Sequence, residues 1–162
     1  MTVSSSTRRA GPFNGNDVTT AFPFTFKVFA GSDVAVYLTD PDGAQTLLPS
    51  GYTVTLNGDQ DASPGGSVNY PTAGDPLATG YTLDLIGAVP FTQGTDITNL
   101  GRFLPNVIER ALDKVTILGQ QLLEKFARAI TYPVGDTAAN TLPTAAVRAS
   151  KAMVVDGDGK GG

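Results

Sequence analysis

The stretch LPNVIERALDKVTILGQQLLEKFARAI, residues 104–130, decides the fold, because it is a long amphipathic segment after a region of short strands and turns. Pro105 suits the first turn of a helix, where its missing N–H would have no partner anyway. Residues 96–99 just before it offer capping side chains. At about 1.5 Å per residue the segment would span roughly 40 Å as a helix, which is longer than a small β domain is wide. We therefore predict a long amphipathic helix over residues 99–131.

The apolar side chains of this helix recur at spacings of four and three residues, the seven-residue repeat of helices that wind around each other. A second stripe beside the first makes the apolar surface wider than a dimer would cover. Gly119 lies in the repeat, where glycine costs about 1 kcal/mol unless close packing requires it. Self-association is the interpretation that we favour, and a helix lying on its own sheet is the alternative. The residues expected between copies are Ile108, Ala111, Leu112, Val115, Leu118, Gly119, Leu122, Phe126 and Ala129.

The region before the helix alternates apolar and polar residues, which is typical of half-buried strands. Turn signals separate the alternating segments, with DPDG at residues 40–43 and a hairpin signal at Asn57-Gly58. We predict a small antiparallel β-sandwich over residues 1–98, and an extended segment, rich in Thr, Pro, Ala and Gly, over residues 132–162. The alternating apolar residues are Phe22, Phe24, Phe26 and Val28; Val34, Val36 and Leu38; Tyr52, Val54 and Leu56; Val68 and Tyr70; Tyr81, Leu83 and Leu85.

The charge of the 162-residue chain is −4 overall and unevenly distributed. Residues 1–101 hold three basic and nine acidic residues, whereas residues 102–130 hold five basic and three acidic ones. Nucleic acid is a poor partner for the acidic region, because phosphate binding needs clustered Lys and Arg. No signal-like start and no run of 18 apolar residues occurs, so we expect neither cleavable secretion nor a membrane span.

The chain contains no His and no Cys, so the common general base and the commonest transition-metal ligands are absent. Asp59 and Asp61 could hold a hard cation, but a solvated hairpin loop is the better interpretation. Residues 156–159, DGDG, resemble the start of a calcium loop that lacks its later ligands. We expect no catalytic, cofactor or metal residues and no enzymatic activity.

Several stretches in a fixed order resemble one family. They are FPFTFKVFAGSDVAVYL, LLPSGYTVT, GGSV, ATGYTLDLIGAVPFTQGTDI and the helical segment itself. Together they resemble the N-terminal part of tail fibre and tailspike proteins of short-tailed bacteriophages, the T7-type tail fibre N-terminal domain among them. The resemblance implies a virion component of the tail, assembled in the bacterial cytoplasm, and a homotrimer joined through a helical bundle. It also implies partners: tail adaptor or nozzle proteins on one side and a distal receptor-binding fibre on the other.

The N-terminal arm, residues 2–9, is the expected tail-binding surface, because it carries the basic pair of an otherwise acidic region. Its candidate residues are Thr2, Val3, Arg8 and Arg9, and strand-edge pairing would supply main-chain hydrogen bonds. Arg8 and Arg9 are otherwise expected to be solvated. An alternative function is a carbohydrate-binding β-sandwich that contacts the host surface through Tyr37, Tyr52, Tyr70 and Tyr81. A third class of function is an enzyme such as a depolymerase, which would need paired carboxylates in a cleft.

Overall fold

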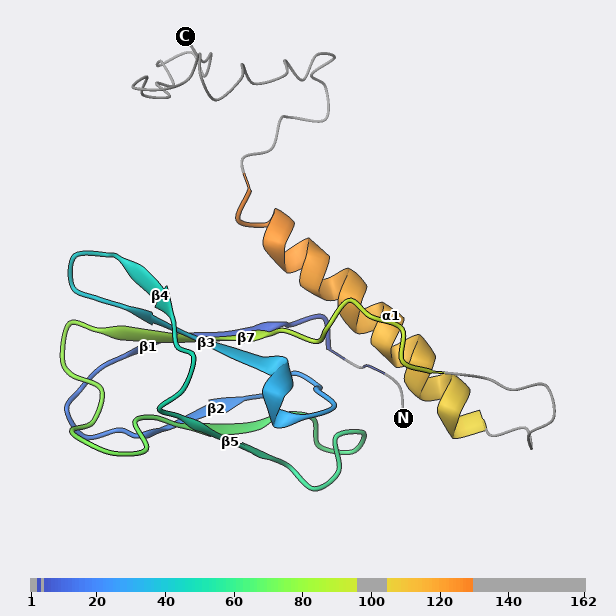
Figure 1. Ribbon diagram of the computed structural model, residues 1–162, viewed down its shortest axis with the longest axis horizontal. Helices are drawn as coiled ribbons and strands as arrows, with labels where there is room; N and C mark the ends of the chain where they lie inside the picture. Colours follow the sequence, from blue (N-terminus) through green and yellow to red (C-terminus); the bar gives the residue numbers. More distant parts are fainter. Residues whose placement is uncertain (1–2, 4, 96–104, 130–162) are drawn as a thin grey trace, which may run out of the picture. The chain divides into compact units, whose positions relative to one another are not determined.

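The computed structural model describes residues 3, 5–95 and 105–129, which belong to one compact unit. Within these residues the chain forms seven strands, a short 3-10 helix and a long α-helix, α1 (Figure 1). The bounds are β1 Arg9–Asn14, β2 Ala21–Phe24, η1 Gly31–Asp33, β3 Val34–Thr39, β4 Gln45–Leu47, β5 Thr53–Leu56, β6 Gly66–Asn69, β7 Thr82–Gly87 and α1 Pro105–Phe126.

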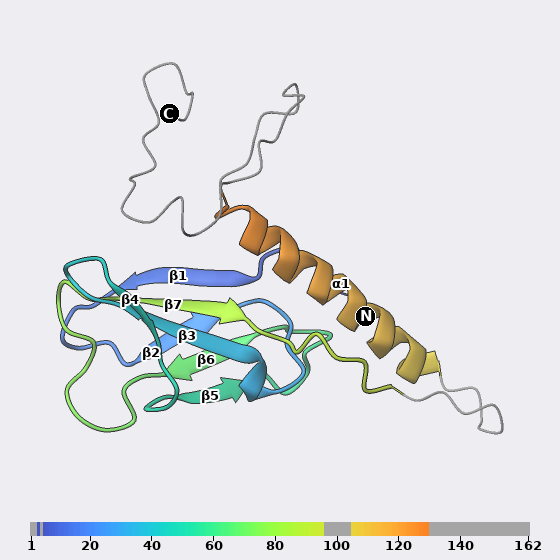
Figure 2. The ribbon, with the colours of Figure 1, turned by 45° about the horizontal axis from the view of Figure 1, so that its top comes forward.

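The strands form two antiparallel sheets, which Figure 2 shows as separate layers. One sheet has the order β1-β7-β3-β4 and the other the order β2-β6-β5. The central pair β3 and β7 is in continuous register from Val34 opposite Gly87 to Thr39 opposite Thr82. The mainly β architecture followed by a helix is therefore confirmed.

The core lies between the two sheets and contains the alternating residues of both. From the four-stranded sheet come side chains of β3 and β7, and from the three-stranded sheet come side chains of β2 and β6. Phe26 and Val28 continue the burial pattern of β2 beyond its last hydrogen-bonded residue. The buried core residues are Phe22, Phe24, Phe26, Val28, Val34, Val36, Val68, Leu77, Leu83 and Leu85.

Five of the strands, β2, β3, β5, β6 and β7, lie where the alternation predicts them, whereas β1 and β4 are not apparent from it. In β1 the register with β7 shifts between Ala10 and Phe13, at a Gly11-Pro12 pair that breaks the alternation. A proline is tolerated there because β1 is an edge strand. The three residues of β4 are all exposed, so they carry no hydrophobic signal.

The hairpin predicted at Asn57-Gly58 is present, although its connection is longer than two residues. Strands β5 and β6 do pair, from Thr53 opposite Asn69 to Leu56 opposite Gly66, but the connection runs over residues 57–65. Gly65 has φ 104° and an added Cβ would lie 2.1 Å from the Phe24 carbonyl oxygen, so only glycine fits. The glycine that this connection requires is therefore Gly65, at the end of the loop, rather than Gly58 at its start.

The helix α1 ends earlier than its sequence predicts. The hydrogen bonds from Arg128 N–H to the Lys125 carbonyl and from Ala129 N–H to the Phe126 carbonyl are of the tighter 3-10 type. The absence of proline or glycine up to residue 131 does not prevent this last turn from tightening, as helix ends commonly do. The expected segments at residues 99–104, 130–131 and 132–162 lie outside the described residues.

Candidate functional site

Three residues of α1, spaced by four, form its buried face. Asp113 and Gln121 are each 4% exposed and Ile117 is fully buried. Residues four apart lie one above the other on a helix, so these three make one narrow stripe. We call Asp113, Ile117 and Gln121 the docking stripe. It fastens α1 to the β domain with one apolar side chain between two polar ones.

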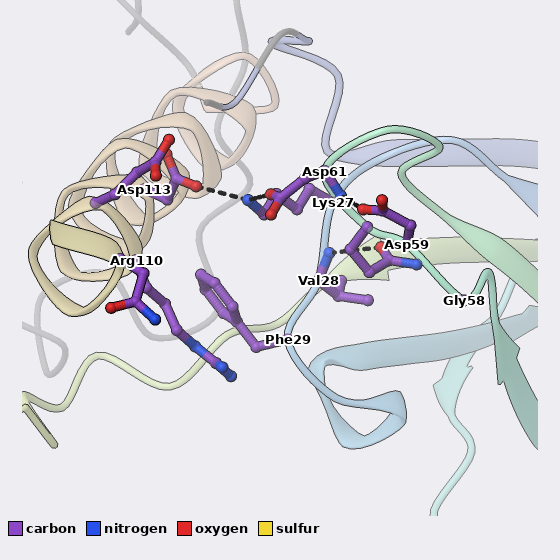
Figure 3. A pocket seen from close by; sticks show the side chains of 11 residues that line it. Lys27, Val28, Phe29, Gly58, Asp59, Asp61, Arg110 and Asp113 are labelled. Carbon is purple, nitrogen blue, oxygen red and sulfur yellow. Dashed lines mark hydrogen bonds and ion pairs between the residues drawn. The ribbon is translucent and has the colours of Figure 1, made fainter. Parts of the chain in front are cut away.

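At Asp113 the docking stripe forms an ion pair with Lys27, whose Nζ donates to Asp113 Oδ2 at 2.6 Å and also to Asp61 Oδ1 (Figure 3). Lys27 is only 8% exposed. Burial alone would lower the pKa of Lys27, but the hydrogen bonds and charges of Asp113 and Asp61 outweigh burial and raise the pKa. The ammonium group in turn lowers the pKa of the exposed Asp61 carboxyl. The charged pair is therefore stable at neutral pH.

At Gln121 the docking stripe binds main chain. The Gln121 side-chain oxygen accepts from Val89 N–H at 2.7 Å, and its amide nitrogen donates to the Val89 carbonyl at 3.1 Å. A side-chain amide has one acceptor and one donor in the same relation as a peptide group, so Gln121 pairs with Val89 as a neighbouring strand would. The chain just after β7 is thereby held on the helix.

The predicted solvated state of Arg8 is wrong, because Arg8 is 2% exposed. Its guanidinium lies 5.0 Å from the centre of the Phe26 ring. One terminal nitrogen donates to the Lys27 carbonyl at 2.6 Å and the other to Gln121 at 3.5 Å. Burial lowers the pKa of Arg8 to about 10, although the charge of Asp33 partly offsets it. Gly87 makes room for the guanidinium, since a Cβ there would lie 2.3 Å from it.

Arg9 also has a partner within the chain. Its guanidinium donates to Asp84 Oδ1 at 3.0 and 2.6 Å, and Asp84 is 4% exposed. Of the other arm residues expected to bind the tail, Val3 is partly buried and Thr2 lies outside the described residues. Both arginines therefore have structural roles in the domain, and tail binding by the arm stays a prediction.

Residues 88–95 run along one side of α1. Besides the Val89 pair, Lys114 Nζ donates to the Thr92 carbonyl at 2.5 Å. Lys125 Nζ lies 5.7 Å from the centre of the Phe91 ring, and that ring is 59% exposed. Successive residues of this segment thus contact the helix at three separated positions.

The apolar repeat of α1 lies on the face opposite the docking stripe. At about 100° per residue, the averaged directions of the two sets differ by roughly 170°. The large side chains of the repeat are exposed: Leu112 by 63%, Val115 by 68%, Leu122 by 47% and Phe126 by 56%. We call these four residues with Gly119 the exposed seam. Of the remaining residues expected between copies, Ile108, Ala111 and Leu118 are partly buried and Ala129 is exposed.

The alternative in which α1 lies on its own sheet is therefore correct in one respect only. The helix does contact its own β domain, but through the docking stripe rather than through its apolar repeat. Sequence reasoning missed Lys27, Asp113 and Gln121, and it assigned Arg8 to tail binding rather than to this contact. The only available signal was the four-residue spacing around Ile117, an apolar residue outside the repeat.

A cavity of about 510 Å³ lies between α1 and the loop after β5 (Figure 3). Most of the charged groups that line it already have partners within the chain. Asp61 and Asp113 form ion pairs with Lys27, and the Asp59 carboxylate accepts hydrogen bonds from the N–H groups of Asp61 and Ala62. These N–H groups, Ala62 first, lower the pKa of the Asp59 carboxyl. The guanidinium carbon of Arg110 lies 5.1 Å from the centre of the Phe29 ring. Most of the charged groups that line the cavity therefore serve the contact between α1 and the β domain.

Within the described ranges, no three acidic side chains gather in a way that could hold a metal ion. The same ranges contain no helix that is long and apolar enough to cross a membrane.

The comparisons with known proteins agree with the resemblance. No family model matches the chain. The tail spike protein of Salmonella phage epsilon15 is 37% identical over 140 residues. These residues cover 82% of this chain but only 12% of the tail spike protein's length. The chain is thus a homologue of a bacteriophage tail spike protein, over a small segment of that protein, as its sequence predicts.

Proposed function

We propose that this chain is the anchor of a phage tail fibre or tail spike. In this proposal the two sheets act as a small β-sandwich that docks on tail adaptor or nozzle proteins. The helix joins three copies into a bundle, from which a distal receptor-binding fibre continues. The protein would be assembled in the bacterial cytoplasm and would serve host adsorption from the virion tail.

The observation that carries the proposal is the division of α1 into two faces. The docking stripe fixes the rotation of the helix on its own domain, because Asp113 and Gln121 each bind a defined partner. That rotation leaves the exposed seam pointing away from the domain. Four large apolar side chains in a seven-residue repeat, each about half exposed or more, are the pattern of a helix that packs against copies of itself.

The width of the apolar surface favours three copies over two. A two-stranded coil covers mainly the two repeat positions, which here are those of the exposed seam. Ala111 and Leu118 precede repeat positions, and Leu123, 70% exposed, follows one. The exposed part of each side chain would remain in water in a pair of helices and would be covered better in a bundle of three.

The described residues give no support to direct carbohydrate binding. Tyr52, Tyr70 and Tyr81 pack against the hydrophobic core, and Tyr37 is partly buried within β3. A sugar platform needs aromatic rings that are exposed together on one face. We also propose no catalytic role and no cofactor for this segment, since a chain without His or Cys offers few general bases or nucleophiles.

The substitution Val115→Asp tests the bundle. Light scattering should show a trimer for the wild-type chain at micromolar concentration and a monomer for the variant, because burying unpaired carboxylates at a shared axis costs several kcal/mol. Val18→Asp is the matched control, since Val18 is 76% exposed in the β1–β2 loop, and it should leave the trimer intact. A wild-type chain that is monomeric would contradict the proposal.

A further inference from the structure

Four large exposed apolar side chains lie outside the exposed seam, namely Val18, Leu47, Phe91 and Leu123, and the last two flank it. Phe91 is 59% exposed and Leu123 is 70% exposed. Single exposed apolar residues are normal on protein surfaces. These two, however, lie on either side of the same helical seam, and their positions are fixed by the contacts of α1 with residues 88–95.

Phe91 lies beside the flank of α1 that carries Lys125. The Lys125 ammonium lies over its ring, and the neighbouring contacts of Val89 with Gln121 and of Thr92 with Lys114 hold the segment in place. The ring is therefore an exposed aromatic on a segment tied at three points. Such an aromatic loses little conformational entropy when a partner covers it.

Leu123 lies on the other flank. It lies two positions before Lys125, which at about 100° per residue places the two side chains roughly 200° apart around the helix. Leu122 and Phe126 of the exposed seam lie between these flanks. Phe91 and Leu123 of one chain therefore cannot meet, because the helix stands between them.

We infer that Phe91 of one copy packs against Leu123 of the next copy in a closed ring, so that the segment after β7 belongs to the contact between copies. The inference rests on the proposed self-association through the exposed seam. Copies related by a cyclic axis run parallel, and each gives one flank to a neighbour and receives the other flank of the second neighbour. The seams meet at the axis, and the two flanks, each with one large exposed apolar side chain, come face to face. The partner is thus a second copy of this chain.

Cross-linking tests the pairing cleanly, because the chain has no cysteine of its own. A Phe91→Cys, Leu123→Cys double variant is treated with a short thiol-to-thiol maleimide cross-linker and run on a denaturing gel. We expect covalent dimers and trimers. A Val18→Cys, Leu123→Cys variant and the two single-cysteine variants are the controls, and they should stay at monomer size.

Light scattering on the same samples separates the two proposals. A trimer that gives no covalent product overturns the Phe91–Leu123 contact and leaves the proposed function intact. A monomer overturns both.

A second measurement does not depend on cysteine reactivity. Phe91→Ala and Leu123→Ala should each weaken assembly about tenfold, as loss of an interface anchor does. The double alanine variant should be little weaker than either single one, since both remove the same contact. Additive losses would contradict the pairing, and Val18→Ala should change nothing.

Discussion

The largest departures from expectation concern single charged residues. Lys27 falls on the polar phase of the alternation through Phe26 and Val28, so the sequence places it in water. In the structure it is buried because Asp113, 86 residues later, covers it. Arg8 is buried by the same helix. A local pattern cannot report such burial, since it depends on a helix that docks from elsewhere in the chain.

The Lys27–Asp113 pair gives the first prediction at this scale. Lys27→Met should destabilise the domain by about 3–5 kcal/mol, because it leaves the Asp113 carboxylate buried without its cation. The double variant Lys27→Met, Asp113→Leu should lose much less, since apolar residues of similar volume commonly replace a buried pair at little cost. Urea unfolding measures both. Asp42→Asn, at an exposed turn, should change stability by less than about 0.5 kcal/mol. If the double variant lost as much stability as Lys27→Met and Asp113→Leu lose together when measured singly, the coupling between the two residues would be refuted.

The raised pKa of Lys27 gives a pH dependence with a defined sign. A base whose folded pKa lies above its unfolded value of 10.5 binds its proton more tightly in the native state. Its contribution is therefore complete below pH 10.5 and is lost as the pH rises through the higher folded value. We expect the difference in unfolding free energy between wild type and Lys27→Met to be constant from neutral pH up to pH 10.5 and to shrink at higher pH. A difference that grows at alkaline pH would mean that the ion pair is not its source.

At the scale of elements, the sequence predicts those helices and strands in which apolar residues recur periodically, and it does not predict elements or contacts made by polar or exposed residues. The repeat of α1 and five of the strands are visible because large apolar side chains recur in them. The docking stripe is not visible, since two of its three residues are polar and their partners, Lys27 and Val89, are distant in sequence. Strand β4, with no buried residue, is not visible for the same reason.

Gly119 gives a prediction that separates the helix from its assembly. Within one chain, an added Cβ at Gly119 meets no atom within 4 Å. Gly119→Ala should therefore stabilise the monomeric fold by up to about 1 kcal/mol through helix propensity alone. If copies approach closely at the exposed seam, the same methyl group should weaken the trimer. Thermal unfolding of the Val115→Asp background isolates the first effect, and sedimentation of the Gly119→Ala variant measures the second. If Gly119→Ala raised both the stability of the monomeric fold and the strength of assembly, the glycine would not be needed for close packing.

At the scale of the whole molecule, the arm, the β domain and the helix meet at one junction. The Arg8 carbonyl accepts from Gly87 N–H at the end of β7, while the Arg8 side chain reaches Lys27 and Gln121. The arm is therefore anchored at its inner end beside the helix. If the arm binds the tail, the residues available for that contact precede Arg8, because the side chains of Arg8 and Arg9 already bind partners within the chain.

The last prediction follows from this boundary. We expect that deleting residues 2–7, which spares Arg8 and Arg9, leaves thermal unfolding and the proposed trimer unchanged but abolishes incorporation of the protein into virions. Incorporation is measured by quantitative mass spectrometry of purified particles. Arg8→Ala is the contrasting variant: it should lower the unfolding temperature, because Arg8 supports the helix junction. Wild-type occupancy after the deletion would rule out the arm as the anchor. The exposed turns at residues 40–43 and 57–66 would then be the next surfaces to test, by substitution of Asp42 and Asp59.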